Sequence, residues 1–260
     1  MRTIGAFLRR DALVAISYRA PFVLEVFSTI ALLITLSLFG RLVPDDAVPG
    51  GYFAFATVGI ALLAFAQAGL GVVASNFRLE QVQGTLEVVL SAGVSTAGLA
   101  AGMAAYPMAF ATGRVAVYAV VGAGMGAIGG EGNSGLALAA VGLAAVSFAG
   151  LGLIAAALVV TIRQAAGAVG LLVTLLALGG GVGFPRELLP GWASSLGTLS
   201  PLTHALDVAR AALFRNASWE SEAPGLAALL GLALASLGLG FATLVLALRR
   251  ARRRGAVADY

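Results

Sequence analysis

Few side chains in this 260-residue sequence are equipped for chemistry, and its single histidine is the most conspicuous. His204 lies three residues before Asp207, so on a helix the two side chains share a face. They form either a proton-coupling pair or a polar contact that holds the helix at an interface. The sequence has no cysteine, so disulfides, thiolate metal sites and thiol nucleophiles are excluded. One histidine without thiolates does not make a metal site, and we predict none.

A serine nucleophile is the other catalytic possibility in this sequence. An intramembrane hydrolase needs a serine activated by a base and faced by oxyanion donors. Ser147, in the string VSFAG, is the only serine near the centre of a late apolar run, and it lacks a preceding glycine pattern. We therefore predict that the chain has no catalytic residue.

Two charged side chains lie inside apolar runs, where an unpaired ion costs a few kcal/mol. Glu25 is early in the first run, and Arg114 is near the middle of the third. Both are candidates for a translocation path. Arg114 alternatively pairs across the helix bundle or is purely structural, with Tyr106 and Tyr118 as polar neighbours, and Glu25 alternatively stays hydrated at the interface.

The composition around these residues is that of a membrane protein. Hydrophobic residues make up 60% of the chain and charged residues 11%, and the mean hydropathy is +0.97. A soluble domain does not cover its surface with so few charges. A span takes roughly 20 apolar residues. Six runs meet this length approximately: Pro21 to Phe39, Tyr52 to Val73, Ala105 to Ile128, Leu136 to Val160, Ala165 to Val182 and Leu226 to Leu248.

The arginines predict the orientation of these spans. All 16 basic residues are arginine; with the N-terminus inside, eleven fall in cytoplasmic segments and four outside, at Arg41, Arg186, Arg210 and Arg215. This bias favours both termini in the cytoplasm, which six spans allow. The net charge of +4 then reflects orientation and lipid contact, with no reason to expect nucleic acid binding.

Three segments outside the spans complete the predicted architecture. Residues 1–20 read as an amphipathic interfacial helix carrying Arg9 and Arg10, with a solvated tail as the alternative and an export signal disfavoured. We expect an all-α polytopic membrane protein: six transmembrane helices, this interfacial helix, and a re-entrant helical segment before the last span. The whole chain, 1–260, is predicted to form a single transmembrane domain.

Residues 75–98 form the second segment, on the cytoplasmic side. An apolar stripe recurs at helical spacing, and the polar residues fall on other faces. We expect a short amphipathic helix, broken or restarted at Gly84 and Thr85, with Thr85 available as a cap. A polar loop is the alternative. The expected stripe comprises Leu79, Val82, Leu86 and Val89, and the residues facing elsewhere are Glu80, Gln81, Gln83 and Glu87.

Residues 184–224 form the third segment, too rich in proline to span and too apolar for an open loop. Ser200 followed by Pro201 predicts a helix start, with an apolar stripe through Leu202 and Leu206. We expect the segment to dip into the outer leaflet and border an exit path, or else to lie on the outer surface. Its candidate site residues are Pro185, Pro190, Pro201, His204, Asp207 and Arg210.

Two strings carry a family resemblance. EQVQGTLEVVLSAGVS resembles the cytoplasmic Gly-Thr-Leu-Glu segment of type-2 ATP-binding-cassette (ABC) exporter permeases, and FPRELLPGWASSLGTLSPLTHALDVARAAL resembles the stretch before the last span of that family. The second match is the stronger, with its Phe-Pro, Leu-Pro and Ser-Pro-Leu-Thr-His-Ala-Leu-Asp-x-x-Arg order. One departure is that Ala92 and Gly93 stand where the family often has proline.

The resemblance implies a half-transporter that dimerises, as a homodimer or with a similar permease, in a bacterial plasma membrane. It implies two copies of a separate ATPase, which bind ATP and Mg²⁺; the chain itself has no phosphate loop and no cofactor. It implies export of a drug, lipid or lipid-linked glycan, with Arg9 and Arg10 near the ATPase. A secondary transporter driven by an ion gradient is the alternative. The implied coupling residues are Glu80, Gln81, Gly84, Thr85 and Glu87.

Overall fold

The computed structural model describes residues 2–17, 19–44, 46–127, 129, 132–162, 165–191 and 197–253, and these contain helices and connections but no β-strand. The all-α prediction is therefore confirmed for the described residues. The first half of the chain contains α1 (Arg2–Ser17), α2 (Arg19–Gly40), α3 (Tyr52–Ala66), the π-helix η1 (Gln67–Val73), α4 (Ala74–Val82), α5 (Thr85–Ser91) and α6 (Thr96–Gly124). The second half contains α7 (Ser134–Thr161), α8 (Ala165–Gly179), the 3₁₀ turn η2 (Arg186–Leu188), α10 (Pro201–Phe214) and α11 (Ala223–Arg253).

Among the described residues, five stretches of helix are long and apolar enough to cross a membrane. The fifth predicted span, Ala165 to Val182, forms α8, which has 15 residues and is shorter than a full crossing. The prediction of a polytopic membrane protein is confirmed by this count, while the number of six spans stays a prediction. The five stretches are Val23–Gly40, Tyr52–Val82, Thr96–Gly124, Ser134–Thr161 and Ala223–Arg250.

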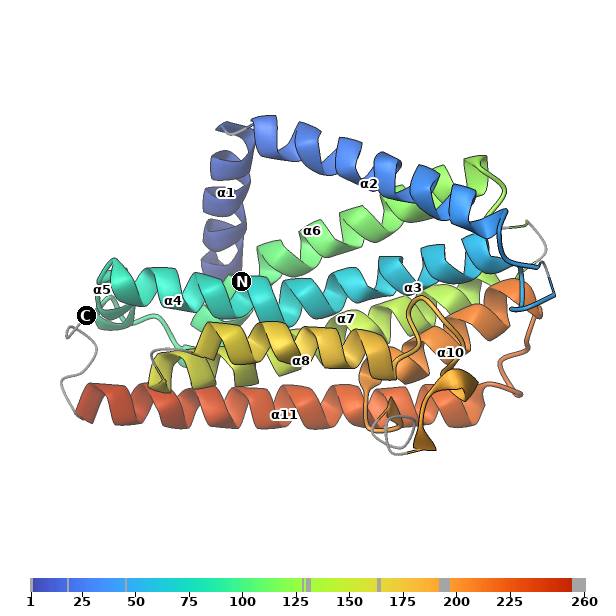
Figure 1. The fold of residues 1–260 in the computed structure, drawn as a ribbon. Helices are drawn as coiled ribbons and strands as arrows, with labels where there is room; N and C mark the ends of the chain where they lie inside the picture. The colour runs from blue at the N-terminus through green and yellow to red at the C-terminus, as the bar shows by residue number, and fades with distance from the viewer. Residues whose placement is uncertain are drawn as a thin grey trace.

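The long helices lie along one axis, with α7 packed between α11 and the continuous rod formed by α3, η1 and α4 (Figure 1). At one end of this bundle lies α5, and at the other lies α10; we call them the α5 end and the α10 end. α1 stands across the bundle and packs on α6, while α2 diverges from α1 towards the α10 end. The two ends are therefore built from different elements.

Glycine lets the central helices approach closely. A Cβ placed on Gly150 of α7 would lie 2.4 Å from the backbone nitrogen of Leu237 in α11, and one on Gly69 would lie 2.1 Å from the carbonyl oxygen of Phe148. Small residues at such crossings are how helices pack in lipid, where apolar burial alone gives little driving force between them. α7 is thus fixed on both sides by backbone contact.

The second apolar run contains a π-helical segment, which sequence patterning did not predict. η1 spans seven residues between α3 and α4, and it places Gly69 against α7. Because π-helical turns change the phase of a helix, side chains beyond η1 face directions that a regular 3.6-residue pattern does not give.

Candidate functional site

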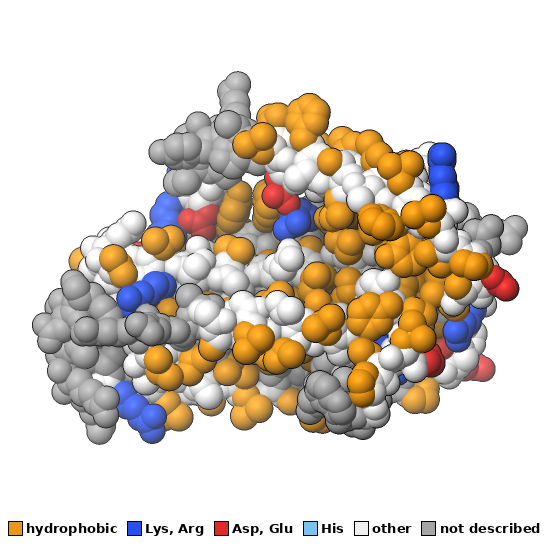
Figure 2. Space-filling model, in the orientation of Figure 1, with side chains coloured by type: hydrophobic (Ala, Val, Ile, Leu, Met, Phe, Trp, Pro, Cys, Tyr) orange, Lys and Arg blue, Asp and Glu red, His pale blue; other side chains and the backbone are white. Residues whose placement is uncertain are grey.

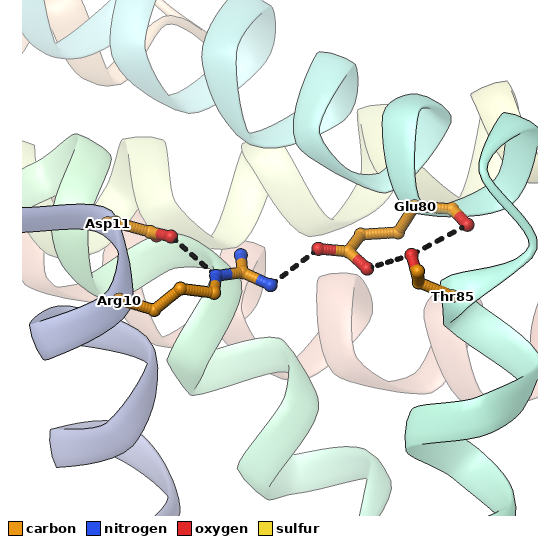
Figure 3. Close-up of polar contacts among 4 residues, drawn as sticks. All are labelled: Arg10, Asp11, Glu80 and Thr85. Atoms are coloured by element: carbon orange, nitrogen blue, oxygen red, sulfur yellow. Dashed lines mark hydrogen bonds and ion pairs between the residues drawn. The ribbon is translucent and has the colours of Figure 1, made fainter. Parts of the chain in front are cut away.

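A polar network joins three helices at the α5 end (Figure 3). Arg10 of α1 donates from Nη1 to Oε1 of Glu80 at 2.7 Å and from Nε to Oδ1 of Asp11 at 2.8 Å. The Thr85 hydroxyl donates to the other carboxylate oxygen of Glu80, and it also lies 3.2 Å from the Glu80 carbonyl oxygen. Glu80 therefore connects α1, α4 and α5; we call these four residues the Arg10 network.

The Arg10 network combines a shielded acceptor with an accessible donor. The Glu80 side chain is 10% exposed, whereas the Arg10 side chain is 47% exposed and also covers the Phe7 ring at 5.0 Å. Burial works to lower the pKa of Arg10, but hydrogen bonds and charge from Asp11 and Glu80 outweigh it, and the pKa is raised. Arg10 therefore stays charged, and an approaching protein can reach it.

The break between α4 and α5 falls at Gly84, as the sequence predicted. Gly84 has φ of +71°, in the left-handed region that glycine adopts without strain, and it is the N-cap of α5. Thr85 was expected to cap the second half of this segment, but it is the first residue of α5 and bonds back to Glu80. This threonine fixes the angle between α4 and α5.

The predicted apolar stripe of this segment was wrong on α4. Leu79 and Val82 are exposed, while Glu80 and Gln81 are buried. The reason is that the Gly84 turn splits the stripe between two helices, and the Arg10 network satisfies the Glu80 carboxylate. On α5 the prediction holds for Leu86, which is fully buried.

Beneath the network, an apolar cluster connects the segment to the rest of the bundle. It joins Phe77 of α4 and Leu86 of α5 to residues of α6, α7 and α11, including Leu244. Phe7 of α1 fits against Gly102 of α6, where an added Cβ would lie 2.5 Å from its ring. α5 is therefore packed directly against the core of the bundle at this end.

Two other residues predicted at the α5 end, Arg9 and Glu87, are not part of the Arg10 network. Arg9 is exposed on α1. Glu87 is a residue of α5, but its side chain lies outside the described part of the structure.

At the α10 end, the helix predicted to start at Ser200 and Pro201 is present. The Ser200 hydroxyl accepts from the Leu202 backbone N–H at 3.2 Å, and Pro201 is in the first turn. His204 and Asp207 do not bond to each other: the His204 ring contacts the Thr198 carbonyl oxygen at 2.8 Å, and Asp207 faces Arg186, at 3.4 Å. Pro185 precedes η2, and Pro190 is exposed in the following turn.

α10 is more deeply buried than a helix on the outer surface. Leu202, Leu206 and Ala209 pack into the central core with α3 and α7, and Thr203 on another face is buried too. Arg210, one turn after Leu206, is only 9% exposed. Its guanidinium donates to the carbonyl oxygens of three residues: Gly181 at 2.9 Å, Val182 at 2.9 Å and Phe55 at 3.0 Å.

Glu25 and Arg114 form an ion pair between α2 and α6, with 2.8 Å between Arg114 Nε and Glu25 Oε1. The contact is one of charge, since Nε makes no aligned hydrogen bond. The pair lines a crevice of about 430 Å³ whose wall includes the stacked rings of Tyr106 and Phe110. Figure 2 shows acidic and basic atoms together in a hollow below the apolar surface of α2.

A comparison with known protein families decides what these elements belong to. The family model described as ABC-2 type transporter matches residues 3–214, which is most of the chain. The chain belongs to the ABC-2 type transporter family. It is accordingly an ABC transporter permease, a multi-pass membrane protein of a family whose members generally work with an ABC ATPase and carry no catalytic site of their own. No curated protein matches the sequence.

Two functional positions of this permease escaped sequence analysis. Gly59 faces the partners of Arg210, and a Cβ there would lie 2.0 Å from the Val182 carbonyl oxygen. Gly181 has φ of +67° and ends α8. In a chain with 35 glycines, neither position stands out, although the Phe-Pro string just after Gly181 was a signal that the helix stops there. In the described part of this permease, no three His, Asp or Glu side chains gather as a metal site would require.

Proposed function

We propose that this permease is the membrane subunit of an ATP-driven exporter and that its coupling surface is the exposed edge of α4 and α5. The observation that carries the proposal is that exposed apolar side chains lie on helices held in place by the Arg10 network and by the buried Leu86. Val82 is 55% exposed and Val88 67% exposed, directly beside the buried Glu80 and Leu86. Apolar side chains at the end of a bundle that also presents Arg10 suit docking of a soluble protein.

The proposed mechanism follows from the contacts of Glu80 and Leu86. Two copies of the ATPase, each binding ATP and Mg²⁺, would dock on a homodimer of permeases, one per α4–α5 edge. When the ATPases close, the Gly84 turn and its two helices are displaced as one piece, because Glu80 holds α5 and α1 together. The apolar cluster under Leu86 passes that displacement to α6, α7 and α11. Gln81 is buried in α4 behind this edge, Glu87 is a residue of α5, and Arg9 would lie within reach of the ATPase and lipid headgroups.

In this proposal the α5 end is cytoplasmic, together with both termini, in the plasma membrane of a bacterium. The distribution of arginines supports this orientation. It places residues 184–224 on the outer side as a re-entrant segment bordering the exit, with α8 as a short fifth crossing. The cargo is a hydrophobic or amphiphilic molecule, and the crevice beside Glu25 and Arg114 borders its path.

Co-purification from native membranes tests the coupling surface. A tag on the C-terminus of the wild type should recover a protein with a Walker motif, identified by mass spectrometry. Val82→Glu and Val88→Glu should each lose it while remaining membrane-inserted and monodisperse, because a charge replaces an apolar contact. The matched control is Leu188→Glu, an even more exposed apolar position at the α10 end, which should keep the ATPase.

Two results would reject the proposal. One is recovery of the ATPase with all three variants, which would place docking elsewhere. The other is absence of any ATPase from the wild type under conditions that retain annular lipid, which would favour an ion-driven secondary transporter.

A further inference from the structure

The guanidinium of Arg210 occupies a site made almost entirely of backbone. Nη1 donates to the Gly181 carbonyl oxygen, and Nη2 donates to those of Val182 and Phe55, all within 2.9 to 3.0 Å. The guanidinium carbon lies 3.3 Å from the centre of the Phe55 ring. Three segments separated by up to 155 residues in sequence therefore meet on one side chain.

The charge of Arg210 is balanced by dipoles and by an aromatic face. Among the described residues no carboxylate forms an ion pair with it, and Asp207, one turn earlier, is directed to Arg186. The acceptors from Gly181 and Val182 lie at the C-terminal end of α8, where the helix dipole is negative. The Phe55 ring adds the attraction of its π face for a cation. A buried cation is tolerated here because each of these groups is already in place.

The backbone that Arg210 binds has a fixed geometry. α8 ends in a Schellman motif, with the Val182 N–H bonded to the Ala177 carbonyl oxygen and the Gly181 N–H bonded to that of Leu178. Gly181 supplies the left-handed turn at φ of +67°. After this turn the chain is no longer helical, so the Gly181 and Val182 carbonyls would lack partners at membrane depth without Arg210.

Gly59 makes room for this arrangement. The Val182 carbonyl approaches α3 so closely that an added Cβ at Gly59 would lie 2.0 Å from its oxygen and 3.0 Å from Arg210 Nη2. The site is thus formed by three elements: α3 from Phe55 to Gly59, the end of α8, and α10.

We propose that Arg210 is a positioning residue that clamps the end of α8 and the start of α3 onto α10, so that these three elements move as one body. We call Arg210, Phe55, Gly181 and Val182 the Arg210 clamp. Its consequence for transport rests on the function proposed above: the outer end opens by displacement of this whole body. The clamp itself does not depend on that function.

Thiol labelling tests the clamp, because the chain has no native cysteine. Val182→Cys places a buried thiol within the clamp while keeping the backbone carbonyl that Arg210 binds, and Ala140→Cys places one in the α7 core as a reporter of general loosening. Each is combined with Arg210→Gln, and the rate of reaction with N-ethylmaleimide is measured on purified permease without ATPase. The control is Arg215→Gln, an exposed arginine just after α10.

The clamp predicts selective labelling. In the Arg210→Gln background the thiol at position 182 should react about ten-fold faster or more, since local opening no longer breaks charge-assisted hydrogen bonds. The thiol at position 140 should stay protected, and Arg215→Gln should change neither rate. If Arg210→Gln yields no monodisperse protein, Arg210→Lys carries the test: lysine keeps the charge but lacks the planar fork, so selective acceleration is again expected.

Either of two results would overturn the clamp. Unchanged labelling at position 182 in both Arg210 variants would show that the side chain holds nothing there. Equal acceleration at positions 140 and 182 would show a general loss of stability instead of a local release. Since no ATPase is present, selective labelling would uphold the clamp even if the co-purification above rejected the exporter.

Discussion

The two ends of the bundle each fix an arginine, but with opposite kinds of partner. At the α5 end, Arg10 is half exposed and bonds to the side chains of Asp11 and Glu80. At the α10 end, Arg210 is buried and bonds to three backbone carbonyls. Side-chain partners can exchange for water or for a docking protein, whereas backbone partners move only with the whole element. We infer that the α5 end can rearrange its contacts when a protein docks, whereas the α10 end keeps a fixed geometry.

The same contrast holds for the glycines. Gly84 has open space around the position of an added Cβ, and its role is the left-handed turn that lets α4 and α5 meet. Gly59 has ordinary helical backbone, and its role is the absence of a side chain beside Val182. The first glycine shapes a surface, and the second permits a close contact.

The largest effect is expected from Gly59→Ala at the α10 end, which tests whether that end is the more rigid one. Overpacking in a core costs typically about 1–3 kcal/mol, and a contact of 2.0 Å with a backbone oxygen belongs at the top of that range or above it. We expect a large loss of thermal stability, measured by unfolding of the purified permease in detergent. Gly142→Ala on α7 is the control, with open space around its Cβ, and it should be neutral or slightly stabilising.

A tolerated Gly59→Ala, with a melting temperature equal to that of Gly142→Ala, would show that the close approach between α3 and the end of α8 is dispensable. The α10 end would then be no more rigid than the α5 end.

A smaller effect is expected from Thr85→Val at the α5 end. Valine keeps the shape but removes the hydroxyl that bonds the Glu80 carboxylate, and a hydrogen bond to a charged group contributes about 1.5–3 kcal/mol. Unfolding should shift modestly, while the ATPase activity of the complex should fall more, because the angle between α4 and α5 is no longer fixed. The control is Thr243→Val, whose hydroxyl bonds only to backbone carbonyls of its own helix, α11. It should leave both the unfolding transition and the ATPase activity unchanged. A variant of Thr85 with normal ATPase activity would remove this residue from the coupling device.

Much of the α10 end follows from local sequence rules. The cap at Ser200 and the burial of Leu202, Leu206 and Ala209 match the predicted start and stripe of α10, since both depend on neighbours within one helix. The partners of Arg210 do not follow from sequence, because they are backbone atoms of distant segments that carry no residue-specific signal. The same is true of Gly59.

At the α5 end, the sequence predicted the break at Gly84 but assigned the wrong faces of α4. A regular helical period places Leu79 and Val82 inside, yet η1 and the Gly84 turn change the phase before and after α4. The burial of Glu80 depends on Arg10, seventy residues earlier. Glu25 and Arg114 were likewise recognised as separate intramembrane charges, and their pairing required the three-dimensional arrangement of α2 and α6.

We propose that the Arg10–Glu80 contact couples the permease to its ATPase, and reversing the two charges is the first experiment to perform. The measurement is the ATP hydrolysis rate of the co-purified complex in lipid nanodiscs for Arg10→Glu, for Glu80→Arg and for the double reversal. We predict that each single reversal, which replaces the 2.7 Å ion pair with two like charges, lowers the rate at least about five-fold, and that the double reversal restores most of it. Single variants that hydrolyse ATP like the wild type, or a double variant no better than either single one, would contradict the account.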